Sequence, residues 1–130
     1  MKNLVDLEKV INSELNTKIN STFIKHNELR LNIDPDDIVE VILFLKNNPN
    51  TKFRQLIDIT AVDYPENKKR FRLVYLLLSL ENNKRISVDY YVKENDKVSS
   101  LTSVFPSANW MEREVFDMYG IVFKDHPDLR

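Results

Sequence analysis

The apolar residues of this 130-residue chain follow a helical period near its start and a strand period soon after. At the N-terminal end they recur at Leu4, Leu7, Ile11 and Leu15. This spacing predicts an amphipathic helix over residues 3–16. Residues 21–33 have the alternating pattern of extended chain, with a turn near Asn27, so they are predicted to form strand structure.

A second helix is predicted after the sequence Asp34-Pro35-Asp36-Asp37. Asp34 is suited to cap the helix, Pro35 suits its first position, and acids favour the positive end of the helix dipole. The helix should end at Asn47-Asn48-Pro49. Its expected apolar face consists of Ile38, Val41, Ile42 and Leu45.

The middle of the chain predicts three strands. Residues 53–62 form the first, with Ile57, Ile59 and Ala61 on one face. Residues 70–80 are nearly continuously apolar, which predicts a central strand covered on both faces. Residues 86–92 alternate, so one face should be buried and the other more polar. Turns are expected at residues 64–67, 81–84 and 94–97.

The last third predicts a helix over residues 108–119, closed by Gly120 in a left-handed conformation. An extended piece over residues 121–123 and a polar tail follow. The order of elements predicts an α+β fold, a mostly antiparallel sheet with helices packed on it, as a single domain over residues 1–130.

A helical wheel of residues 108–119 places two aromatic side chains outside the expected core stripe. Phe116 lies past one edge of the stripe, and Trp110 lies on the other flank. Such aromatics favour a second packing surface, for instance a partner protein. Loops of the same chain could cover them instead, and both interpretations stay open at this point. The expected core stripe consists of Ala108, Met111, Val115, Met118 and Tyr119.

The composition excludes several kinds of site. The chain has no cysteine, which excludes disulfides, clusters held by cysteine thiolates and thiolate zinc sites. It has one glycine, which is too few for a phosphate-cradling loop. A net charge of −1 gives no basic field for nucleic acid. No apolar run approaches the roughly 20 residues of a membrane helix. The first residues show neither the long apolar core expected of a secretory signal nor the Arg- and Ser-rich character expected of a transit peptide.

The last predicted helix is densely charged, with Glu112, Arg113, Glu114 and Asp117. Arg113 and Asp117 have the spacing of an ion pair within a helix. The acids together with His126 raise the hypothesis of an acid–base or metal site. However, Glu112 and Glu114 diverge by about 200° on the helix, so they cannot share a ligand. A salt-bridge network that fixes the helix and its partner is therefore favoured.

The run from Glu112 to Ile121, followed by His126-Pro127-Asp128-Leu129-Arg130, closely resembles the signature of the C subunit (the 30 kDa subunit family) of respiratory complex I, NADH:quinone oxidoreductase. We call residues 112–130 the signature segment. Residues 53–63 also resemble the first sheet strand of that family. The order of the predicted elements resembles that family over most of the chain, whereas the specific sequence motif is confined to the signature segment. Family members continue beyond the Leu-Arg step, so the chain is expected to be either a truncated or a short form.

The resemblance implies a structural and assembly subunit of the hydrophilic arm, without catalytic, cofactor-binding or metal-binding residues of its own. It implies packing beside the large D subunit, which helps to form the quinone pocket, and near the cluster-bearing B and I subunits. FMN and iron–sulfur clusters would lie in other subunits, and NADH and quinone would be bound by the complex. The chain would be peripheral on the plasma or inner membrane, on the cytoplasmic side in a bacterium or the matrix side in an organelle.

Two alternatives remain beside this interpretation. The chain could be the homologous subunit of a membrane-bound hydrogenase or of a photosynthetic NDH-type complex. From a different class, it could be a stand-alone hydrolase that uses Glu114, Asp117 and His126 in one pocket. The residues expected to face partner subunits are Trp110, Glu112, Arg113, Glu114, Phe116, Asp117, Met118, Gly120, His126, Pro127, Asp128, Leu129 and Arg130.

Overall fold

The computed structural model describes residues 3–127, and this part of the chain contains three α-helices and seven strands. The helices are α1 (Leu4–Glu14), α2 (Ile38–Asn47) and α3 (Ala108–Tyr119), and a 3₁₀ turn, η1 (Pro35–Asp37), precedes α2. The strands are β1 (Ile19–Lys25), β2 (Glu28–Ile33), β3 (Gln55–Asp63), β4 (Phe71–Ser79), β5 (Lys84–Val92), β6 (Lys97–Ser99) and β7 (Val122–Lys124).

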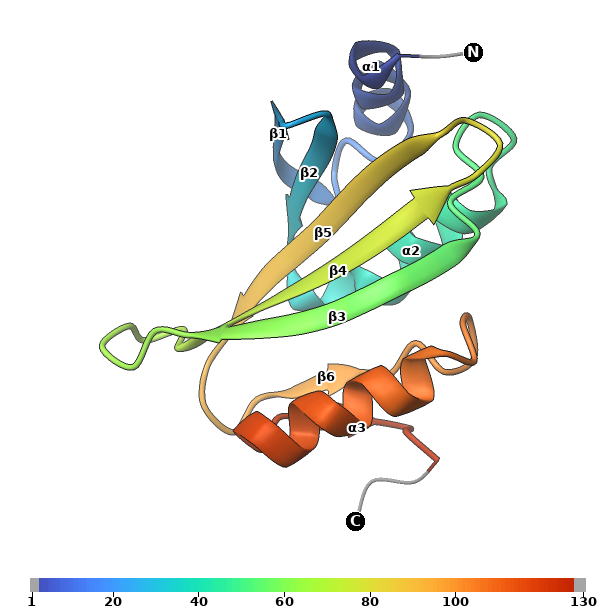
Figure 1. The fold of residues 1–130 in the computed structure, drawn as a ribbon. Coiled ribbons are helices and arrows are strands. Elements are labelled where there is room, and N and C mark those ends of the chain that lie inside the picture. Colours follow the sequence, from blue (N-terminus) through green and yellow to red (C-terminus); the bar gives the residue numbers. More distant parts are fainter. Residues whose placement is uncertain (1–2, 128–130) are drawn as a thin grey trace.

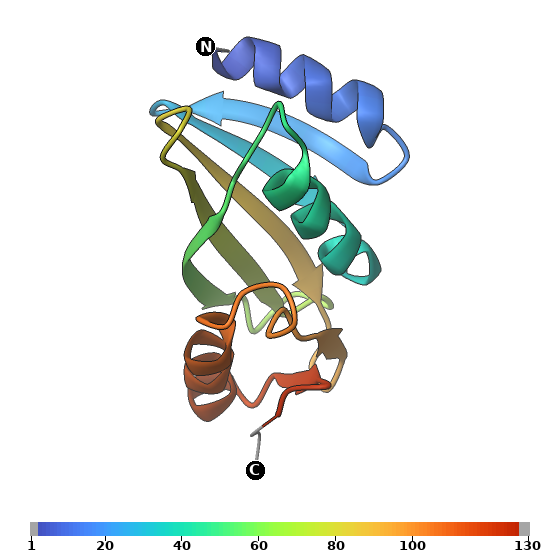
Figure 2. The same cartoon turned by 90° about the vertical axis from the view of Figure 1, so that its right-hand side faces the viewer.

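Five strands form one sheet in the order β1-β2-β5-β4-β3, and β6 pairs with β7 in a second, two-stranded sheet (Figure 1). In the five-stranded sheet only β2 and β5 are parallel, and the other neighbours are antiparallel. The prediction of an α+β fold with a mostly antiparallel sheet is confirmed. Helix α1 lies near β1 and β2, α2 lies across the sheet, and α3 lies beside β3 (Figures 1 and 2).

The buried apolar side chains of all three helices and of both sheets form one hydrophobic cluster. The alternation in β5 places Ile86, Val88, Tyr90 and Val92 in this cluster, as predicted. Strand β7 contributes Phe123, so the segment after α3 is anchored in the same core.

Strand β3 differs from the prediction in the residues that it buries. Ile57 was expected on the same face as Ile59 and Ala61, yet 42% of it is exposed whereas Ile59 is buried. Leu56 and Ile59 are buried instead, and Ala61 is partly buried. A β-bulge between Leu56 and Asp58 accounts for the difference, because one extra residue shifts the alternation of side chains along the strand.

The second face of β4 is only partly covered. Phe71, Leu73, Tyr75 and Leu77 are buried, whereas the residues between them keep intermediate exposure. The expected cover on both faces is therefore complete on one face of β4 and only partial on the other. Polar groups occupy part of this second face, where Arg72 donates a hydrogen bond to Asp89 at 2.6 Å.

The predicted ends hold for α3 and for the C-terminal end of α2, whereas α1 ends at Glu14, before the predicted Asn16, and α2 begins only at Ile38. Asp34 makes no capping hydrogen bond. Its carboxylate accepts from the side chain of Asn20 at 3.0 Å, and the chain enters α2 through the 3₁₀ turn. The expected turn at residues 81–84 has Asn83 in the left-handed region, with φ of 52°. Over residues 3–127, none of the helices combines the length and the apolar character needed to cross a membrane.

Candidate partner interface and the buried Glu112 cluster

Helix α3 directs one face into the core and the opposite face to solvent. Ala108, Glu112 and Val115 are buried. Trp110 is 68% exposed and Met118 is 74% exposed. The expectation that Met118 belongs to the core stripe is therefore wrong, whereas Trp110 lies outside the core as predicted. We call the exposed side of α3 that carries these two residues the docking face.

The end of α3 and the strand after it fix the position of this face. Gly120 has φ of 73°, and its N–H donates to the carbonyl of Phe116 at 2.8 Å, which closes the helix as predicted. The chain then forms β7, which runs parallel to β6. This pairing was not predicted, because a parallel partner lies far away in the sequence.

Glu112 is the centre of a buried polar cluster that also contains Ser100, Leu101 and Thr102. The Ser100 hydroxyl donates to Oε1 of Glu112 at 2.6 Å, and the Leu101 N–H donates to Oε2 at 2.7 Å. The Ser100 and Thr102 hydroxyls lie 2.9 Å apart. Both carboxylate oxygens thus have donors, which is the requirement for a charged group inside a protein.

Burial raises the pKa of the Glu112 carboxyl above its ordinary value, because desolvation disfavours the charged form. The hydrogen bonds from Leu101 and Ser100 and the nearby His126 act in the opposite direction. Burial also raises the pKa of Tyr75 and Tyr90, whose hydroxyls lie 2.6 Å apart, and the negative charge of Glu112 adds to both shifts.

His126, which follows β7, contacts the first turn of α3. Its side chain is fully buried, and Nε2 lies 2.9 Å from the carbonyl oxygen of Asn109. Since a carbonyl only accepts, Nε2 must carry the proton in this contact. Nε2 is also 4.0 Å from Oε1 of Glu112, a distance at which a protonated imidazole would stabilise the carboxylate.

The residues predicted to face partners divide into three groups. The side chains of Glu112 and His126 are buried, and Phe116 is half-buried. Asp128, Leu129 and Arg130 lie outside the described residues. The exposed members are Trp110, Arg113, Glu114, Asp117, Met118, Gly120 and Pro127.

The acid–base hypothesis required Glu114, Asp117 and His126 to converge in one pocket. The structure does not bring them together, because the first two are exposed while the His126 side chain is buried beside Glu112. Among residues 3–127, no group of three His, Asp or Glu side chains is arranged to hold a metal ion.

The burial of Glu112 could have been predicted from its position in the helix, although it was considered above only as one of several charged residues. Glu112 follows Ala108 by four positions and precedes Val115 by three, so it lies about 40° from Ala108 and about 60° from Val115 on the helical wheel, at the edge of the core stripe. A lone acid at such a position predicts a buried carboxylate with dedicated donors. Its donors, Ser100 and the Leu101 N–H, come from the loop before α3, which the helical pattern alone could not identify.

A groove of about 310 Å³ lies between α3 and the neighbouring strand β3. The wall from α3 includes Glu114 and Met118, and the wall from β3 includes Asp58. The remaining lining residues are Ile59, Thr60, Ala61, Val115 and Tyr119.

Comparison with known proteins identifies similar sequences over most of the chain. The sequence profile of the family described as "Respiratory-chain NADH dehydrogenase, 30 Kd subunit" matches residues 31–130. The C subunit of NADH-quinone oxidoreductase from Dinoroseobacter shibae is 54% identical over 85% of this chain and 51% of its own length. The protein of the same name from Xanthobacter autotrophicus is 46% identical over 98% of this chain and 61% of its own length. The chain thus spans about half to two thirds of these curated relatives.

Two solved structures have the same fold. A structure described as the trypsin-resistant fragment (1-134) of Nqo5 superimposes with a TM-score of 0.80 at 31% identity, covering 95% of this chain and 98% of that one. A chain of the membrane-bound sulfane sulfur reductase, an archaeal respiratory membrane complex, gives a TM-score of 0.84 at 21% identity, covering 96% of this chain and 72% of that one. At that identity the second similarity shows the fold alone.

Proposed function

The chain belongs to the family of the 30 kDa subunit of respiratory-chain NADH dehydrogenase, and from this premise we propose that it is a structural and assembly subunit of a proton-pumping NADH:quinone oxidoreductase. In this proposal it carries no cofactor and performs no catalytic step. It packs in the hydrophilic arm beside the large D subunit and near the B and I subunits. It is peripheral on the membrane, on the cytoplasmic side in a bacterium or the matrix side in an organelle.

The docking face of α3 is the observation that carries this proposal. Trp110 and Met118 expose most of their surface on the helix that opens the signature segment. Aromatic and methionine side chains are enriched in the cores of protein interfaces, where a partner removes them from water. Hydrogen bonds to Glu112 on the buried side of α3 hold the helix in place. The exposed side chains are therefore presented in a fixed position, which lowers the entropic cost of binding.

The amino-acid composition of the chain also supports a structural role. The chain has no cysteine to hold an iron–sulfur cluster and only one glycine. These residue types agree with FMN and the clusters lying in other subunits, and the proposal assigns the binding of NADH and quinone to other subunits as well. A subunit of a related membrane-bound hydrogenase or NDH-type complex is the less favoured alternative, because the similar curated sequences are named as C subunits of NADH-quinone oxidoreductase.

The replacement Trp110→Ala tests the proposal. We expect the variant to keep its thermal stability, because the side chain is mostly exposed, and to recover about tenfold less of the D subunit in a pull-down from native membranes. Leu80→Ala is a matched control, since Leu80 is also 68% exposed but lies in the turn between β4 and β5. Equal recovery of the D subunit by both variants would contradict the proposed docking face.

A further inference from the structure

Strand β3 has one edge without a strand partner in the described chain. It is the last strand of the five-stranded sheet and pairs only with β4. From Asp58 to Asp63 the pairing with β4 runs without interruption over six residues. Alternate N–H and C=O groups of this stretch point away from β4, so the free edge can accept another extended segment.

Two of the residue types that commonly protect a free edge are missing between Asp58 and Asp63. This stretch contains neither a lysine nor a proline, which native proteins place on edges to prevent pairing. The β-bulge lies before it, at Leu56 to Asp58, and leaves the rest of the strand regular. Helix α3 runs beside β3 without adding a strand to it (Figure 1).

The groove between β3 and α3 offers apolar and acidic surfaces together. Ile59, Ala61 and Val115 form apolar parts of its lining, and the exposed Met118 continues them onto the docking face. Asp58 and Glu114 are exposed and contribute carboxylates from opposite walls. None of the lining residues is a lysine or an arginine, so the charge of the groove is negative.

We propose that this groove binds an extended segment of a partner subunit, in which lysine or arginine alternates with apolar residues, as an added strand on the edge of β3. Backbone hydrogen bonds to residues 58–63 would supply affinity, and alternate side chains would reach Met118 on one side and the carboxylates on the other. A second copy of the chain is disfavoured as the occupant, because Asp58 and Glu114 would then face the same acids. The inference rests on the proposed function and names the form of the bound segment.

Amide hydrogen exchange on the full chain, alone and within the complex isolated from native membranes, tests the added strand. The amides of residues 58–63 that face the free edge should exchange at least about tenfold more slowly in the complex than in the free chain. Unchanged exchange at residues 58–63 in a complex that still depends on Trp110 would overturn the added strand and leave the proposed function standing. A chain that never enters the complex would overturn both.

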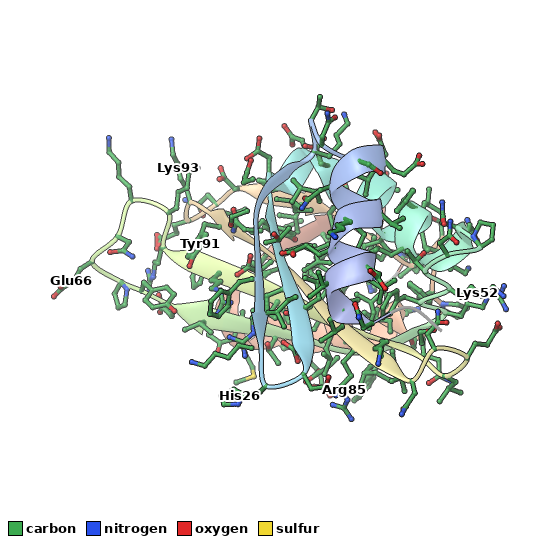
Figure 3. All side chains as sticks on the ribbon, turned by 90° about the horizontal axis from the view of Figure 1, so that it is seen from above. His26, Lys52, Glu66, Arg85, Tyr91 and Lys93 are labelled. Atoms are coloured by element: carbon green, nitrogen blue, oxygen red, sulfur yellow. The ribbon has the colours of Figure 1, made fainter. Side chains whose placement is uncertain are left out.

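Charge reversal tests the chemistry of the occupant. Glu114→Lys should lower the amount of complex recovered with the chain about tenfold, because the basic segment would then meet a cation. Glu66→Lys makes the same change in charge at the tip of the turn between β3 and β4 (Figure 3), at a residue that does not line the groove, and should leave recovery unchanged. Equal recovery with the two variants would refute a basic occupant. A free chain that already dimerises with residues 58–63 protected would assign the edge to a second copy.

Discussion

Glu112 has the most restrictive environment of the carboxylates on α3. Its side chain is buried, and two donors that come from one loop hold its oxygens. Hydrogen bonds to a charged acceptor each contribute about 1.5–3 kcal/mol, which offsets part of the cost of burying the carboxylate. Glu112 therefore fixes α3 against the loop at Ser100 and Leu101, and it acts on the docking face only through the position of the helix.

The raised pKa of Glu112 predicts a definite dependence of stability on pH. An acid whose pKa is higher in the folded than in the unfolded state favours folding below the unfolded value and loses that contribution as the pH rises through the folded value. Glu112→Gln keeps the shape of the side chain without this titration. From about pH 4.5 upward, the free energy of unfolding of the native chain should therefore fall relative to that of the variant.

Urea unfolding of both proteins between pH 4 and pH 8 checks this prediction. The difference in the free energy of unfolding should change in favour of the Gln variant as the pH rises. A change in the opposite direction would mean that the donors and His126 outweigh desolvation, so that the folded protein lowers the pKa of Glu112. Glu66→Gln, at an exposed position, serves as the control for a change in charge alone.

At the scale of the element, α3 has a specific cap at its C-terminal end but none from a side chain at its N-terminal end. Ser107 makes no capping hydrogen bond at the beginning of the helix. Gly120 ends the helix in the left-handed region, and a Cβ atom built there would meet no atom within 4 Å. The need for glycine at this position is thus one of backbone conformation, since L-residues with a Cβ are strained at positive φ.

Replacement of Gly120 should therefore act through backbone strain alone. Gly120→Ala is expected to lower the free energy of unfolding by about 1 kcal/mol, whereas Gly120→Asn should lose less because Asn tolerates the left-handed region. Chemical denaturation of the two variants measures the difference. Equal losses for Ala and Asn would show that something other than φ determines the effect.

At the scale of the whole molecule, one core joins the parts that carry the docking face and the groove. The buried residues of α1, α2, α3, β7 and the five-stranded sheet belong to a single cluster. The part of the chain from β6 onward is therefore not an appendage, even though it pairs in a separate small sheet. Residues far apart in the sequence, such as Leu7 and Phe123, share this cluster.

A single core predicts a single unfolding transition. Trp110 is the only tryptophan and reports on α3, while far-ultraviolet circular dichroism reports on all helices and strands. The two signals should give the same midpoint in urea, because a domain with one core unfolds cooperatively. Phe123→Ala should shift both midpoints together, at a cost of about 3–5 kcal/mol. An earlier transition of the tryptophan signal would show that the C-terminal part unfolds separately, against the prediction of one domain over residues 1–130.

The sequence by itself determined the types and order of most elements. Helical spacing identified α1, α2 and α3, and alternation identified β5, because these patterns depend on neighbours within a few residues. Gly120 and Asn83 marked an end and a turn for the same local reason. The signature segment also indicated the family, which the comparisons confirm.

Only the tertiary structure decided which side chains lie inside and which groups meet. The bulge in β3 exposed Ile57, the packing of α3 exposed Met118, and the loop before α3 brought Ser100 and Leu101 to Glu112. These outcomes depend on strand register and on loops distant in the sequence, which periodicity does not contain. The docking face and the groove beside β3 follow from that packing, so the chain had to be folded before either surface could be defined.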